Sequence, residues 1–185
     1  MIVGITAHEI IVNECIAENI DFEELYLGSR DLLVKLNDGK AFAKRRGRNW
    51  IKNTSKKIPY RTLYLKMAEE PWKYSRKEKR SFAWKVVCEQ WFEEKSHLML
   101  EQMKKFVEEG AELAHIIEAV YMRGTNTQKT DLSMQLELNM GHTKYFSVKK
   151  DAIVLYGLML WKYCKRRDYE DKDRGIIDYN GYFVE

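Results

Sequence analysis

The sequence contains little proline and little cysteine. Of its 185 residues, two are proline and three are cysteine. Cys15, Cys88 and Cys164 are odd in number and far apart, and no CxxC pair occurs, so the pattern predicts neither a disulfide framework nor a zinc site. We expect reduced thiols that serve as packing residues.

Long apolar runs and targeting signals are also missing. No apolar run approaches membrane-spanning length, and the first residues lack the basic start and the small-residue cleavage site of a secretion signal. These features predict a cytoplasmic protein without a membrane partner.

Sequence motifs that carry catalytic or metal chemistry are absent as well. The chain has no GxSxG, Walker-type loop, GxGxxG or Cys–His pair suited to nucleophilic catalysis. Its histidines are too widely separated for an HxxxH or HExxH set on one helix, and the glutamates of residues 89–112 are more simply interpreted as a solvated helix face. We therefore predict a protein that is not an enzyme and has neither cofactor nor metal.

The charges that are present are unevenly distributed. The net charge is +4, but residues 35–61 hold ten Lys or Arg against the single acid Asp38, whereas the first 31 residues hold seven acids against Arg30. This asymmetry favours a polyanionic partner on one side of the protein, with solvated surface lysines as the plainer alternative. The hydrophobic content of 45% is ordinary for a globular chain that buries a core.

The hydrophobic pattern predicts a mainly α fold with one small N-terminal β-hairpin and a C-terminal helix-turn-helix. The apolar run after Asp31, the turn at residues 37–39 and the alternation up to Lys44 predict the hairpin. Apolar residues at helical spacing predict the helices, which cover most of residues 7–24 and residues 60–69, 75–107 and 111–122.

We divide the chain into three parts. Residues 1–70 would form an N-terminal helix, the hairpin and a basic connecting region, and residues 71–164 a helical domain that ends in the helix-turn-helix. Residues 165–185 show no clear period, which predicts a partly extended or loosely packed C-terminal tail.

Residues 130–156 carry the most informative pattern: a short helix, a turn and a second helix. Thr130 or Asp131 can cap the first helix, and residues 139–141 supply the turn, with Met140 pointing inward. In the second helix, the positions expected to be buried recur every three or four residues; they are Tyr145, Val148, Ala152 and Leu155 or Tyr156. The plainer alternative is an ordinary antiparallel helix pair.

The polar residues of this segment would meet DNA if the second helix enters a major groove. Lys144 and His142 would then donate to guanine, and Thr143 and Ser147 would bind bases or phosphates. Phosphate contacts, which position a protein without reading sequence, are expected from Lys129, Thr130 and Lys150. The plainer interpretation of each residue is a solvated surface group.

The segment LNMGHTKYFSVKKDAI, residues 138–153, resembles the C-terminal end of the ArpU-type phage transcriptional regulators. Tyr145 and the run from Lys149 to Ile153 match the family's Tyr and Lys-Lys-acid-Ala-aliphatic pattern in order and spacing. The segment is also similar to the fourth region of bacterial sigma factors and to RinA-type activators of phage late genes. The resemblance covers about the C-terminal third of the chain, and Gln135 and Gly141 depart from it.

The resemblance implies a sequence-specific, double-stranded DNA-binding transcriptional regulator of phage or prophage type, in the cytoplasm of a bacterial host cell. Candidate further partners are RNA polymerase, another protein or a second copy of the chain in a homodimer. Two alternatives remain open: a DNA-packaging module similar to terminase small subunits, and an inhibitor or adaptor that uses the helix-turn-helix as a protein-binding scaffold.

Overall fold

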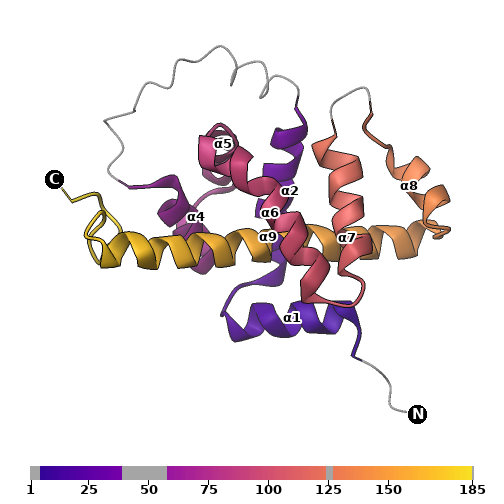
Figure 1. Cartoon of the computed structure of the whole chain (residues 1–185), viewed down its shortest axis with the longest axis horizontal. Helices are drawn as coiled ribbons and strands as arrows, with labels where there is room; N and C mark the ends of the chain where they lie inside the picture. Colours follow the sequence, from indigo (N-terminus) through magenta and orange to yellow (C-terminus); the bar gives the residue numbers. More distant parts are fainter. Residues whose placement is uncertain (1–4, 39–57, 124–126, 185) are drawn as a thin grey trace.

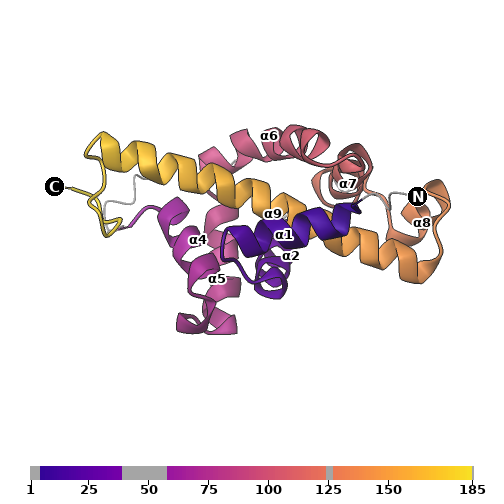
Figure 2. The same cartoon turned by 90° about the horizontal axis from the view of Figure 1, so that it is seen from below.

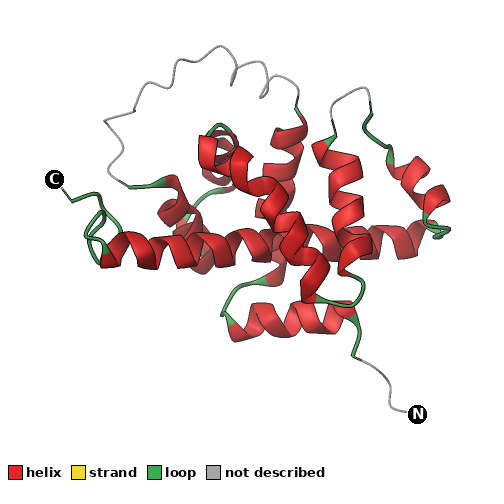
Figure 3. Ribbon diagram, in the orientation of Figure 1, coloured by secondary structure: helices red, strands yellow, loops and turns green. Residues whose placement is uncertain are grey.

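The computed structural model describes residues 5–38, 58–123 and 127–184. Within these ranges the chain is built from helices and contains no strand (Figure 3). In chain order the elements are α1 (Ala7–Ala17), α2 (Phe22–Asn37), α4 (Tyr60–Glu69), the 3-10 turn η1 (Pro71–Lys73), α5 (Arg76–Val87), α6 (Gln90–Phe106), α7 (Gly110–Ile117), the π-helical turn η2 (Glu118–Met122), α8 (Asp131–Glu137) and α9 (His142–Asp173).

Helix α9 is the central helix, on which most of the other helices pack. Its 32 residues give a length of about 48 Å, and Figure 1 shows it running from one end of the structure to the other. Every position from Asp151 to Trp161 is buried, because α2, α4, α6 and α7 pack on α9 and α1 lies along another side of it (Figure 2). This stretch is apolar around most of its circumference, as expected of a helix surrounded by protein.

The contact between α2 and α9 depends on a glycine. A Cβ atom at Gly157 would lie 1.8 Å from the Oγ of Ser29, a side chain with no exposed surface. Glycine therefore lets the Ser29 side chain pack directly on the α9 backbone, and a Cβ atom at this position would force Ser29 to shift. The hydroxyl of Tyr64 on α4 donates to the Gly157 carbonyl at 3.3 Å, so three helices meet at this point.

The predicted N-terminal β-hairpin is wrong. Residues 31–37 belong to α2, and residues 39–44 lie outside the described residues. The helix forms because the apolar run continues a helical spacing set earlier in the segment, with buried residues at Leu25, Ser29, Leu32, Leu33 and Leu36. Asp21 also caps this helix, since its carboxylate accepts from the Glu24 amide at 2.8 Å.

The predicted extended tail begins later than residue 165, because α9 continues to Asp173. Residues 174–184 then fold back in a tight turn with one isolated antiparallel bridge, Ile177 to Phe183. Gly181 has a φ of 85°, and the Asp178 carboxylate accepts from the Tyr182 amide at 2.8 Å. This turn lies on α4, where the Lys66 ammonium donates to the Asn180 carbonyl at 2.6 Å.

The other predicted helices are present with changed limits. Residues 60–69 are helical as predicted, whereas the helix expected over most of residues 7–24 is interrupted at Asn19, whose φ is 55°. The helix expected from residue 75 to 107 is divided into α5 and α6. One hydrophobic cluster includes side chains from α1 through α9. None of the described helices is both long enough and apolar enough to cross a membrane.

Candidate nucleic-acid interface

Helices α8 and α9 are joined by a short turn, at the positions predicted for the helix-turn-helix. The Thr130 hydroxyl caps α8 by accepting from the Ser133 amide at 3.2 Å. Helix α8 ends at Glu137, and Asn139, two residues later, has a φ of 50° in the left-handed region that asparagine tolerates after helix ends. Met140 then packs against the core as predicted, and Gly141 is the N-cap of α9.

A polar brace fixes α8 against α9. The Tyr145 ring is fully buried, and its hydroxyl donates to the Asp131 carboxylate at 2.8 Å. The Lys149 ammonium donates to the same oxygen at 2.6 Å. Burial, and then the neighbouring Asp131 carboxylate, raise the pKa of Tyr145, so this hydroxyl stays protonated and remains a donor. The brace makes the turn a rigid unit.

The π-helical turn η2 ties this unit to the core. A π turn shifts the backbone hydrogen bonds to residue i+5 and leaves nearby carbonyls available. The Lys129 amide donates to the Ala119 carbonyl at 2.9 Å, and the Gln128 side chain donates to the Val120 carbonyl at 2.7 Å. The segment that leads into α8 is therefore anchored immediately before the cap at Thr130.

Four of the seven predicted DNA-binding residues lie together at the start of α9. All four are exposed on its first turns: His142, Thr143, Lys144 and Ser147. The side chains of Thr143, Lys144 and Ser147 make no hydrogen bond or ion pair with the described part of the chain. The His142 ring lies 4.6 Å from the Phe146 ring, measured between centroids. Gly141 has no side chain that could cap α9, so the first amides of this helix also have no side-chain partner in the part of the chain that the structure describes.

The other three predicted residues have partners within the protein. Lys129 forms an ion pair with Glu137, and Thr130 is the cap described above. Lys150 pairs with Glu23 of α2 and lies over the rings of Phe22 and Tyr26 at 5.5 and 5.2 Å. Since Lys149 is engaged by Asp131, Lys144 is the one lysine of residues 127–150 that has no carboxylate partner among the described residues. The surface is thus less basic than its sequence suggests.

Two exposed leucines were not part of the predicted site. Leu132 and Leu136 are 66% and 75% exposed, one turn apart on the outer face of α8. Their spacing is visible in the sequence, and because Met134 is the buried residue of this short helix, both leucines face away from the core. The brace formed by Asp131 and Lys149 was also missed, because these residues are 18 positions apart.

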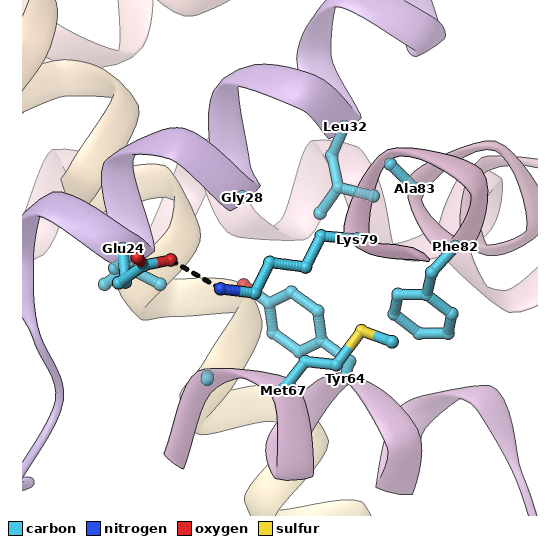
Figure 4. Close-up of a pocket in the computed structure, with 10 residues that line it drawn as sticks. Glu24, Gly28, Leu32, Tyr64, Met67, Lys79, Phe82 and Ala83 are labelled. Carbon is cyan, nitrogen blue, oxygen red and sulfur yellow. Dashed lines mark hydrogen bonds and ion pairs between the residues drawn. The ribbon is translucent and has the colours of Figure 1, made fainter. Parts of the chain in front are cut away.

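A pocket between α2, α4 and α5 does not qualify as a ligand site. It is lined mainly by apolar side chains, and Lys79 reaches across it to Glu24 at 2.7 Å (Figure 4). Its volume is about 40 Å³, whereas ligand pockets typically have roughly 300 Å³ or more. The described residues also contain no group of three or more His, Cys, Asp or Glu side chains that could hold a metal ion.

Comparison of the chain with protein-family models, curated protein sequences and solved structures gave no match. The resemblance of residues 138–153 to phage regulators therefore remains a prediction from the sequence.

Proposed function

We propose that this protein binds duplex DNA through α8 and the first turns of α9. The observation that carries the proposal is the exposed polar group at the start of α9, on a helix-turn-helix unit braced by Asp131, Tyr145 and Lys149. Figure 1 shows this unit at one end of the molecule, where a duplex can approach it. A rigid base and free donors are what base recognition requires.

The burial of α9 limits how it can meet DNA. From Asp151 to Trp161 the helix is enclosed by the core, so at its N-terminal end only about the first two turns can enter a groove. The helix would therefore point its N-terminus into the major groove, with Lys144 and His142 as donors to base edges. Its free amides and positive helix dipole would favour a phosphate beside Thr143.

The test is binding to labelled genomic fragments over a salt series. We compare the wild type with a Lys144→Ala, Thr143→Ala variant and with Lys105→Ala as control, because Lys105 is an exposed lysine on α6 far from this unit along the chain. Each lost base contact should cost about 1–3 kcal/mol of binding free energy. Retention of one fragment by the wild type and the control, with loss in the double variant, supports the proposal; equal binding by all three proteins contradicts it.

The regulatory role rests on the resemblance of residues 138–153 to phage transcriptional regulators. A fragment recovered by the binding assay should then contain a promoter, and transcription from it should change when the protein is added. Transcription that is unaffected by saturating protein would separate DNA binding from regulation.

A protein-binding adaptor is the second candidate function, because Leu132 and Leu136 expose two large apolar side chains beside the proposed DNA surface. In this case a Leu132→Ser, Leu136→Ser variant should lose a partner that the Lys144→Ala, Thr143→Ala variant keeps. The two double variants therefore distinguish the two functions.

A further inference from the structure

Helix α5 carries more uncompensated positive charge than its surroundings. Its 12 residues include five Lys or Arg and one acid, Glu78. Two of the cations turn inward toward α2: Arg76 pairs with Asp31 at 2.8 Å and Lys79 with Glu24 at 2.7 Å. The inward side of α5 is therefore electrically balanced.

The remaining three cations, Lys77, Arg80 and Lys85, are exposed and have no hydrogen-bond or ion-pair partner among the described residues. The single acid of α5, Glu78, forms no ion pair with them, because its carboxylate accepts from the Ser75 amide and hydroxyl at 2.8 and 2.7 Å in a capping box. Glu78 keeps its negative charge, so three cations against one acid leave this side of α5 with a formal charge of +2.

Pairing is the common arrangement elsewhere in this protein. On α9, for example, the ion pairs formed by lysines and arginines include Lys150 with Glu23, Lys162 with Glu14, Lys165 with Glu18, Arg167 with Glu170 and Lys172 with Asp168. A helix with three neighbouring unpaired cations differs from this pattern and presents a local positive potential.

A groove lies directly beside these cations, between α4 and α5. Lys77, Ser81 and Lys85 line one side of it, and Tyr60 and Tyr74 contribute aromatic rings. Lys77 and Lys85 are separated by eight residues, or about 12 Å along the helix, which is about the rise of three to four nucleotides along a duplex. The groove thus combines two cations, hydroxyl groups and aromatic faces with one acid, Glu78, and Arg80 lies outside its lining.

We propose that this α5 surface, defined by Lys77, Arg80 and Lys85 with Tyr60 and Tyr74 of the groove, binds the phosphodiester backbone of nucleic acid. Arginine and lysine suit phosphate oxygens, and tyrosine rings can stack on bases that leave a duplex. The surface shares no residue with the helix-turn-helix, so the inference does not rest on the function proposed above.

The experiment measures binding of two fluorescent probes by anisotropy over a salt series: oligothymidine, and a duplex of the same length and unrelated sequence. The α5 variant is Lys77→Gln, Arg80→Gln, Lys85→Gln. Its matched control, Lys95→Gln, Lys105→Gln, Arg174→Gln, removes the same charge from cations that also have no carboxylate partner among the described residues. Thermal unfolding checks that both variants are folded.

Loss of three phosphate contacts should make the slope of log K against log salt shallower by about 2 for the single strand and by about 2.7 for the duplex. A larger loss for oligothymidine, with a further loss in Tyr74→Leu, identifies a single strand in the groove; similar losses for both probes identify a duplex backbone. Equal effects of the α5 variant and its control overturn the proposal.

The Lys144→Ala, Thr143→Ala variant separates this inference from the function proposed for α8 and α9. If only the α5 surface binds nucleic acid, that variant keeps its affinity for both probes while the α5 variant loses it. If only the helix-turn-helix binds DNA, the α5 variant matches its control and retains the specific fragment.

Discussion

Gly28 and Gly157 both lie in the middle of a helix, but their surroundings are opposite. A Cβ atom at Gly28 would have no atom within 4 Å and would border the small pocket of Figure 4, whereas one at Gly157 would clash with Ser29. Glycine in a helix interior costs about 1 kcal/mol relative to alanine when nothing requires it. The same substitution should therefore change the free energy of unfolding in opposite directions.

We expect Gly28→Ala to raise the free energy of unfolding by about 0.5–1 kcal/mol and Gly157→Ala to lower it by about 1–3 kcal/mol. Urea unfolding followed by circular dichroism measures both values. Since each variant is the control for the other, stabilisation by both substitutions would show that α2 and α9 can separate without cost.

Glu137 forms an ion pair with Lys129, one of the predicted phosphate-binding residues. Its carboxylate accepts from Lys129 and from the His115 ring at 2.8 Å, and hydrogen bonds from Lys129 first and His115 second lower the pKa of Glu137. Because the pKa is lowered in the folded state, this link between α7 and α8 is present above pH 4.5 and is lost as the pH falls through the lowered value.

If the proposed DNA surface is correct, Glu137→Gln should bind duplex DNA more tightly than the wild type. The substitution releases Lys129 for a phosphate, which should make the slope of log K against log salt steeper by about 0.9. Glu101→Gln is the matched control, because Glu101 forms a similar exposed ion pair with Lys104 on α6. An unchanged slope would exclude Lys129 from the DNA surface.

At the scale of the helices, the packing of α1 on α9 shows how much of the stability of a helix contact comes from buried apolar side chains. It lies against α9 through Ile11, which is fully buried, while Ile16 on the same helix is 69% exposed. Lys162 and Lys165 of α9 add ion pairs to Glu14 and Glu18, but such pairs near the surface stabilise little. Burial of apolar side chains should therefore contribute more to the stability of this contact than the ion pairs do.

Ile11→Ala should therefore lower the free energy of unfolding by about 2–5 kcal/mol, since it leaves a cavity in the core. Ile16→Ala removes the same atoms from the surface and should change it by about 0.5 kcal/mol or less. Chemical denaturation compares the two. A small effect of Ile11→Ala, similar to that of Ile16→Ala, would mean that α1 contributes little to the fold.

The same elements show which features the sequence could reveal. The turn between α8 and α9 was predictable because Asn139 and Gly141 are turn residues between two periodic segments. The full length of α9 was not, because its central residues are buried on several sides and leave no polar face to give a period. In α2 the adjacent Leu32 and Leu33 are also typical of a strand, and only the spacing that begins at Leu25 distinguishes the helix.

The candidate site was predictable only in part, because a sequence pattern reveals local exposure but not contacts between distant residues. Exposure of Thr143, Lys144 and Ser147 follows from the local period of α9, with Tyr145 on its buried side. The pairing of Lys150 with Glu23 joins positions 127 residues apart, and that of Lys129 with Glu137 depends on how α8 folds back. Charge counted along a sequence therefore overestimates the charge available to a ligand.

At the scale of the whole molecule, the three cysteines report whether the described helices unfold together. Cys15 on α1 and Cys164 on α9 are buried, and Cys88 at the end of α5 is partly exposed. Burial first, then Glu14 and Asp21, raise the pKa of Cys15 to about 11, and burial also raises the pKa of Cys164. A thiol reagent at pH 8 should therefore modify Cys88 alone in the folded protein.

Cys15 and Cys164 belong to one hydrophobic cluster, so both should react only when that cluster opens, and at the same rate. Mass spectrometry of the protein after timed labelling measures each rate, and labelling in denaturant gives the rate of the free thiols. Reaction of Cys15 well ahead of Cys164 would show that α1 leaves α9 in a separate step. Equal rates would instead mean that α1, although it reaches the core from its own side of α9, unfolds in the same cooperative unit as the part of α9 that carries Cys164.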